Sequence, residues 1–292
     1  MGYVLDITYY LHSGFSCAIG DTFLIFDYWL GEKGELRENK RIRVEELRKY
    51  KNVYVFVSHS HPDHLDPVIY DWKNEPNVQY IVSYETPEEY SGTRMESGDT
   101  IELQDQIKVS AFESTDLGIA FLVDIYGIHI FHAGDLNFWH WREESTAQDI
   151  EEAEIAFKEA CKPIIGKPID IAFFPVDPRQ GRLFDAGANY FAMTIKPRLM
   201  IPMHFWGRNE LIVEYARRSR TRETEILVMT SQGEKMRIEF SDDGFMTINI
   251  LSHQYMNTLD TEYNEIDQMV MEEGNPFSDT DLPVKIDEEN EK

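Results

Sequence analysis

An apolar segment that runs straight into a cluster of histidine and aspartate side chains is the feature that most constrains this chain. Asn52–Val57 is apolar after its first residue, which is typical of a strand buried on both faces of a sheet. Immediately afterwards the chain presents His59, His61, Asp63 and His64. So many imidazole and carboxylate groups are hard to explain as packing, because polar groups are costly to bury without partners. The sequence therefore predicts a sheet with a polar site at the end of this strand.

The chemistry of this cluster favours metal ions. Neutral imidazole and carboxylate are ligands that zinc, manganese and iron accept in proteins. His59 and His61 alternate on an extended segment and can face the same way, whereas Asp63 and His64 lie across the following turn. Two pairs of ligands from one loop suit two adjacent metal ions.

Two other apolar segments end in candidate ligands. Ile128–His132 is followed by Ala-Gly-Asp135, and Leu199–Met203 is followed directly by His204. Side chains at strand ends sit on loops that a rigid sheet holds in place, which is where binding and catalytic residues concentrate. Asp135 can bridge two cations because a carboxylate has two oxygens.

The remaining pattern is one of strands with helices between them. Further strands are expected at Tyr3–Leu11, Phe15–Ile19, Phe23–Asp27, Val78–Ser83, Ile107–Phe112, Ile119–Tyr126, Ile169–Pro175, Ile226–Thr230, Lys235–Phe240 and Phe245–Leu251. Helical spacing predicts helices at Lys33–Tyr50, Ser145–Ala160, Ala186–Ile195 and Glu210–Ser219. No linker rich in proline or glycine interrupts residues 1–254, so we expect one layered α/β domain there.

Charge separates a C-terminal segment and excludes one class of partner. Residues 255–292 are expected to form an acidic tail, in which Leu259, Tyr263, Ile266 and Val270 have the spacing of an amphipathic helix. The formal net charge of the chain is −25. Such a polyanion repels phosphate backbones, so nucleic acid is not expected as a partner.

Nothing in the sequence points to a membrane or to secretion. No apolar run approaches the roughly 20 residues that a membrane-spanning helix needs. The N-terminus lacks a basic region followed by an apolar one, so we expect no signal peptide. Cys17 and Cys161 have no metal-type spacing and are expected as buried thiols of a reducing compartment. We therefore expect a cytoplasmic protein, with a monomer and a homo-oligomer both left open.

The motifs together resemble those of a known superfamily. His59-Ser-His-Pro-Asp-His64, His132-Ala-Gly-Asp135 and Ile201-Pro-Met-His204 are similar to successive motifs of the metallo-β-lactamase-fold hydrolases. Asp170–Pro175 and Ile195–His204 also resemble the branch similar to L-ascorbate-6-phosphate lactonase. The resemblance runs from residue 3 to about residue 250. It implies a four-layer αββα sandwich with the metal ions at one edge, between the sheets.

The same resemblance implies how the ligands divide between two metal ions. One metal would be held by His59, His61 and a third residue. The other would be held by Asp63, His64 and His204, and Asp135 would lie between the two.

The third ligand of the first metal departs from the superfamily pattern. The superfamily usually supplies a histidine here, but Glu113–Gly118 contains none. Some members instead carry a histidine three residues before the bridging aspartate. This likeness predicts His132 as the replacement, with Asp116 as the rival ligand.

Five other residues have candidate roles around such a site. His12, in a turn, can donate a proton or stabilise an anion, or it can simply cap backbone groups. Trp139 and His140 closely follow the bridging aspartate and are predicted to form a substrate wall, with simple packing as the alternative. Arg179 and Arg182, on a loop after a strand, can bind a phosphate or carboxylate, or can be paired at the surface.

Together these features predict a hydrolase with two divalent metal ions. Zinc is the metal expected, and manganese and iron are the alternatives. Two cations lower the pKa of a bridging water, and the hydroxide would attack a small ester, lactone or phosphoester substrate. Catalytic roles are expected for Asp63, Asp135 and His12. The alternatives are a phosphodiesterase acting on small or lipid substrates, and a non-catalytic metal-binding module whose acidic tail recruits a partner.

Overall fold

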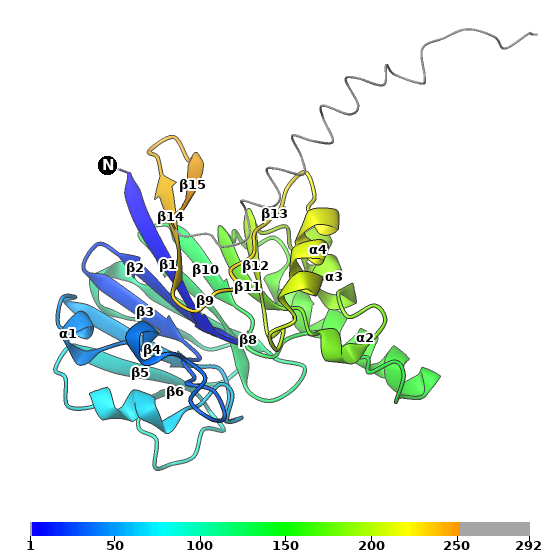
Figure 1. Ribbon diagram of the computed structural model, residues 1–292, viewed down its shortest axis with the longest axis horizontal. Helices are drawn as coiled ribbons and strands as arrows, with labels where there is room; N and C mark the ends of the chain where they lie inside the picture. Colours follow the sequence, from blue (N-terminus) through cyan, green and yellow to red (C-terminus); the bar gives the residue numbers. More distant parts are fainter. Residues whose placement is uncertain (1, 252–292) are drawn as a thin grey trace, which may run out of the picture. The chain divides into compact units, whose positions relative to one another are not determined.

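The strands form two mixed β-sheets in the computed structural model, which describes residues 2–251 (Figure 1). The first sheet has the order β15-β14-β1-β2-β3-β4-β5-β6. From β3 to β6 neighbouring strands are parallel, and the other pairs in this sheet are antiparallel. Its strands are β1 (Tyr3–Leu11), β2 (Gly14–Ile19), β3 (Thr22–Phe26), β4 (Asn52–Val57), β5 (Val78–Ser83), β6 (Thr93–Met95), β14 (Glu234–Phe240) and β15 (Met246–Ile250).

The second sheet has the order β13-β12-β11-β10-β9-β8-β7. From β10 to β13 the neighbours are parallel, and from β7 to β10 they are antiparallel. Loops that follow parallel strands leave the sheet at the same edge, which is where open sheets of this kind bind ligands. The strands are β7 (Thr100–Glu102), β8 (Lys108–Glu113), β9 (Ile119–Ile125), β10 (Ile128–His132), β11 (Ile171–Pro175), β12 (Leu199–Met203) and β13 (Glu225–Ile226).

The two sheets pack face to face through aromatic side chains. Phe15 of β2 stacks on Phe173 of β11 with ring centroids 4.3 Å apart, and Phe56 of β4 meets Phe121 of β9 at 5.2 Å. Successive residues of a strand face opposite sides, so Phe56 belongs to this central core and its neighbour Val55 to a second cluster on the outer face. Strand β4 is therefore buried on both faces, as its apolar sequence predicts.

Short helical segments cover the outer face of the first sheet. They are α1 (Val44–Leu47) and the 3₁₀ helix η2 (Pro67–Trp72). Leu47, Ile69 and Trp72 from these segments are buried in the second cluster.

Longer helices cover the second sheet, and the sandwich therefore has four layers (Figure 1). Phe157 of α2 and Phe191 of α3 pack against Phe174 of β11. The αββα architecture implied by the resemblance is confirmed. The helices are α2 (Ala147–Cys161), α3 (Ala186–Thr194) and α4 (Asn209–Ser219), with the 3₁₀ segments η1 (Glu38–Lys40), η3 (Gln104–Gln106), η4 (Lys162–Ile164) and η5 (Pro178–Gln180) elsewhere.

One expected helix is wrong. Lys33–Tyr50 contains only η1 and the single turn α1, because apolar residues fix the segment to the sheet as a loop. The N–H of Leu36 bonds to the carbonyl of Leu30 at 2.8 Å, and the N–H of Ile42 donates to the hydroxyl of Tyr28 at 3.0 Å. The short strands β6 and β7 were not expected, since neither carries an apolar run.

Three further expectations concern the C-terminal tail, membrane-spanning helices and the two cysteines. The tail expected at residues 255–292 lies outside the described residues. Within residues 2–251, every helix is too short or too polar to pass through a membrane. Cys17 and Cys161 are buried free thiols, as expected.

Candidate metal centre

One edge of the sandwich gathers strand ends from both sheets. The first sheet contributes His12 from the β1–β2 turn and the cluster that follows β4. The second sheet contributes Asp135 from the loop after β10 and His204 at the end of β12. Among the described residues, this edge contains three groups whose potential ligand atoms lie within 4.8 Å of one another.

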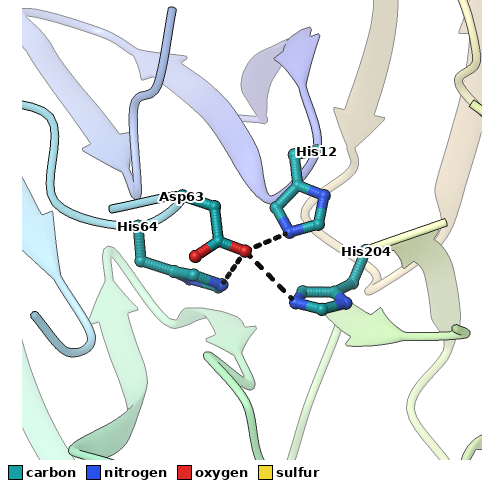
Figure 2. Close-up of side chains that lie close together, drawn as sticks. All are labelled: His12, Asp63, His64 and His204. Atoms are coloured by element: carbon teal, nitrogen blue, oxygen red, sulfur yellow. Dashed lines mark ion pairs between the residues drawn. The ribbon is translucent and has the colours of Figure 1, made fainter. Parts of the chain in front are cut away.

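The first group consists of His12, Asp63, His64 and His204 (Figure 2). The carboxylate of Asp63 lies among the three imidazoles. Its Oδ2 is 3.1 Å from His12 Nε2, 3.8 Å from His204 Nε2 and 4.0 Å from His64 Nε2. The three histidines are buried, whereas the Asp63 side chain is partly exposed.

The other two groups are His59–His64–Asp135 and His61–Asp116–Asp135. They share Asp135, whose two oxygens face different ligands. Its Oδ2 lies 3.4 Å from His59 Nε2, whereas its Oδ1 lies 3.2 Å from His64 Nε2 and 3.4 Å from His204 Nε2. A carboxylate placed in this way can bridge two cations.

Unpaired atoms and neutral imidazoles at the site fit metal ions. His12 Nε2, His64 Nε2 and Asp135 Oδ1 are buried without a hydrogen-bond partner, although buried polar atoms are almost always partnered. Burial, helped by His204, lowers the pKa of His12 to about 3, and burial, helped by His64, lowers the pKa of His59 to about 3. Both imidazoles are therefore neutral at neutral pH, which is the form that binds metal.

The electrostatics around His64 also favour a cation. Burial by itself lowers the pKa of His64, but Asp135 and Asp27 outweigh burial and raise that pKa well above its usual value. Burial raises the pKa of Asp135, but His64 and His204 outweigh burial and hold that pKa well below its usual value. Two buried carboxylates thus stabilise positive charge between them. A divalent cation provides such charge.

Two buried aspartates that the sequence reasoning missed hold the imidazoles in place. Asp27 Oδ2 accepts hydrogen bonds from His64 Nδ1 at 2.7 Å and from Ser58 Oγ at 2.6 Å. Asp177 Oδ2 accepts one from His204 Nδ1 at 3.0 Å. Each contact leaves the Nε2 of its histidine directed toward the ligand groups. A signal was present, since Asp27 directly follows β3 and Asp177 closely follows β11.

His132 lies apart from the three groups. Its ring faces the core between the sheets, parallel to the ring of Phe26 at 5.2 Å. Its Nε2 donates to the carbonyl of Ser13 at 2.9 Å, and its Nδ1 accepts from the N–H of Gly134 at 3.2 Å. Because both nitrogens bond to the backbone, the structure does not support His132 as the third metal ligand. The rival, Asp116, is part of a candidate group.

The backbone at the site is unusually strained. Positive φ is disfavoured for residues other than glycine, and such strain tends to collect at functional sites. Several residues of this edge adopt it, namely His12 (56°), Asp27 (41°), Trp141 (35°), His204 (61°) and Trp206 (48°).

A cavity of about 460 Å³ opens over the ligand groups. Asp63, Asp135 and His204 are among the residues that line it. Trp139 and Arg179, both expected to contact substrate, line it as well. Its aromatic wall consists of Trp29, Trp139, Trp141 and Trp206.

Arg179 is held against this wall by two contacts. Its guanidinium lies over the ring of Trp206, 4.2 Å from the ring centroid. Its Nη2 pairs with Asp177 Oδ2 at 2.6 Å, so the carboxylate that positions His204 also offsets the charge of Arg179.

Two residues expected to bind substrate do not line the cavity. His140 is buried, its Nε2 donates to the carbonyl of Leu183 at 3.0 Å, and its Nδ1 accepts from the N–H of Arg142 at 3.1 Å. Arg182 is exposed. The structure therefore does not support a substrate contact for either side chain.

Comparisons with known proteins agree with this fold. A family model described as the beta-lactamase superfamily domain matches residues 6–204. This match covers more than half of the chain, and the protein belongs to that family. No curated protein matches the chain.

Solved structures share the metallo-β-lactamase fold of this chain. Igni18, a metallo hydrolase from the archaeon Ignicoccus hospitalis, is 15% identical with a TM-score of 0.55, over 82% of this chain and 100% of that one. YhfI, a metallo-beta-lactamase fold protein from Bacillus subtilis, is 12% identical with a TM-score of 0.53, over 85% of this chain and 100% of YhfI. A protein from Parabacteroides distasonis described as a candidate metal-dependent hydrolase is 16% identical with a TM-score of 0.54, over 78% of this chain and 94% of that protein.

Proposed function

We propose that this protein is a hydrolase that holds two divalent metal ions and cleaves a small ester, lactone or phosphoester. The observation that carries the proposal is that two of the three ligand groups share Asp135, which lines the cavity and lies 3.4 Å from His204 Nε2 of the remaining group. Two cations held there would lower the pKa of a water between them and supply hydroxide near neutral pH.

The ligand groups divide into two metal sites. Asp116 takes the place expected for His132, since its Oδ2 lies 3.8 Å from His61 Nδ1 and both lie near Asp135. We assign zinc first, with manganese or iron as alternatives, because imidazole and carboxylate donors suit all three. The first metal would be held by His59, His61 and Asp116, the second by Asp63, His64 and His204, and Asp135 would serve both sites.

The composition of the cavity walls favours a small, partly apolar substrate. Four tryptophan side chains offer flat apolar surface above the ligand groups. Trp139 is fixed there because its Nε1 donates to the carbonyl of Asp135 at 2.7 Å. Arg179 is the one lysine or arginine among the described residues that line the cavity, and Asp177 partly neutralises it. This arrangement suits a ring or acyl group with at most one anionic substituent, as in the lactonase-like branch that the sequence resembles.

Metal analysis followed by a substrate panel tests the proposal. Protein purified without chelator should contain about two equivalents of metal per protomer after dialysis. Reconstituted with the metal found, it should hydrolyse members of a panel of small esters, lactones and phosphodiesters. A metal content near zero would refute the proposal. Two metals without turnover on the panel would favour the non-catalytic metal-binding alternative.

Single substitutions test the division into two sites. Asp63→Ala and His204→Ala should each reduce metal content from about two equivalents to about one, because each removes a ligand of the second metal only. Equal retention of both metals in both variants would show that the assignment is wrong.

A further inference from the structure

We propose that His12 is a fourth protein ligand of the second metal ion, together with Asp63, His64 and His204. The inference rests on the proposed function, since it extends one of the two metal sites. His12 reaches the site from the β1–β2 turn, and its ring lies beside the carboxylate of Asp63 (Figure 2).

The backbone holds His12 against the other ligands. Its N–H donates to the hydroxyl of Tyr9 at 3.0 Å, and its carbonyl accepts from the N–H of His204 at 3.4 Å. Its φ of 56° is left-handed, a conformation that is disfavoured for a residue with a Cβ. Asparagine or glycine would form this turn with less strain. Backbone strain of this kind tends to collect at functional sites, which agrees with a role for the imidazole in the ligand group.

The free nitrogen of His12 is directed into the ligand group. The side chain is 2% exposed, and its Nε2 has no hydrogen-bond partner. Asp63 Oδ2 lies 3.1 Å away but does not lie where an Nε2–H would point. The two atoms are therefore close without being bonded to each other, as expected for two ligands directed toward one ion.

The spacing between His12 Nε2 and Asp63 Oδ2 fits two ligands of a single coordination sphere. Donor atoms about 2.0–2.2 Å from one cation lie about 3–3.5 Å from one another. Asp63 Oδ2 lies 3.1 Å from His12 Nε2, within this range, whereas it lies 4.0 Å from His64 Nε2 and 3.8 Å from His204 Nε2. A metal bound by Asp63, His64 and His204 is thus within reach of His12.

Two other roles for His12 fit the geometry less well. A proton donor to a leaving group must touch the substrate, but His12 is not among the residues that line the cavity. Trp29 and Trp206 line it instead, and their rings meet His12 edge-on at 5.5 and 4.5 Å. A residue that orients Asp63 by a hydrogen bond would need an aligned N–H, which His12 lacks.

A fourth ligand changes the preference of the second site among metals. With Asp135, the second metal would have five protein ligands, whereas zinc sites usually have three or four. A crowded site of imidazoles and carboxylates favours ions that accept six ligands, such as manganese or iron. His12 therefore shifts the preference of the second site toward manganese or iron, whereas zinc remains the first choice for the first site.

Two variants of His12 separate the roles. His12→Asn accepts the left-handed backbone but is too short to reach the metal. His12→Gln is longer than His12→Asn, and its amide can donate a hydrogen bond to Asp63. The measurements are metal content after dialysis and stepwise titration of the metal-free proteins with Co²⁺, followed by visible absorption. His129→Gln, on β10 and outside the three groups, is the matched control.

Both His12 variants should bind the first equivalent of Co²⁺ normally, which shows that they fold, and should bind the second more than about 100-fold more weakly than wild type. Loss of a supporting hydrogen bond costs about 10–100-fold, so rescue of the second equivalent by His12→Gln would overturn the inference in favour of an orienting role. Two tightly bound metals in both variants would also overturn it while leaving the proposed function intact. Wild-type protein that binds fewer than two metals would refute both.

Discussion

Asp27→Asn should weaken binding of the second metal ion by about 10–100-fold, or about 1.4–2.8 kcal/mol. The substitution preserves shape and removes one charge at a residue that is 1% exposed. Asp27 is not among the residues that line the cavity, and it contacts a proposed ligand directly through its hydrogen bond to His64 Nδ1.

The mechanism follows from three hydrogen bonds. Asp27 Oδ1 accepts from the N–H of Ser58 at 2.8 Å, and its Oδ2 accepts from Ser58 Oγ and from His64 Nδ1. An asparagine must keep its oxygen on the Ser58 N–H, which places its NH₂ group against His64 Nδ1. That nitrogen then has to accept rather than donate, and the proton moves to Nε2, the atom that would bind metal.

Stepwise metal titration with a competing chelator measures the effect. The affinity for the first equivalent should change little, and that for the second should fall. Asp124→Asn, which removes a carboxylate that is 42% exposed, is the matched control and should leave both affinities unchanged. An Asp27→Asn protein with wild-type affinity for two metals would refute this account of His64.

Three shorter predictions concern other parts of the molecule. Asp116→Ala should lose the first metal and most turnover. His132→Ala should retain about two equivalents of metal and lose about 2 kcal/mol of unfolding free energy with its two backbone hydrogen bonds. Metal analysis and denaturant unfolding test this pair, and loss of the first metal in His132→Ala but not in Asp116→Ala would show that His132 is the ligand. The hydrogen bond to Asp170 raises the pKa of His129 in the folded protein. The bond therefore stabilises the fold fully below the pKa of His129 in the unfolded chain, about 6.5, and this stabilisation is lost as the pH rises through the higher pKa of the folded protein. His129→Gln should therefore cost about 1 kcal/mol near pH 5.5 and less near pH 8 in urea unfolding, and an equal cost at both would contradict the reasoning. Deleting the residues after Gly274 should change neither melting temperature nor turnover, because they include no proposed ligand, and a large fall in either would mean that the tail contributes to the folded site.

The parts of the site that are local in sequence could be predicted, and those that depend on tertiary contacts could not. His59, His61, Asp63 and His64 follow one strand, so spacing alone brings them together. Asp27 contacts His64 only because β3 and β4 are adjacent and parallel, a pairing that the sequence does not reveal.

His132 shows a second limit of sequence reasoning. Its position at a strand end is correct, but a strand end does not say which face of the sheet the side chain takes. Along β10 the side chains alternate, and His132 faces the core with Ile130, while Phe131 packs on α3. Asp135 reaches the metal groups only because the chain turns after the strand ends. Likewise, the helical spacing of apolar residues in Lys33–Tyr50 predicted a helix, whereas burial of Leu36 and Ile42 produces a loop.

The aromatic wall gives the protein a built-in optical reporter. Four of its five tryptophans line the cavity, and the fifth, Trp72, is buried on the outer face of the first sheet. Most of the intrinsic fluorescence therefore originates beside the candidate metal centre. Entry of a ligand, or exchange of zinc for a paramagnetic ion that quenches emission, should change the signal of the whole protein. Unlabelled protein can thus be screened against compound libraries in a fluorimeter, before any substrate is known.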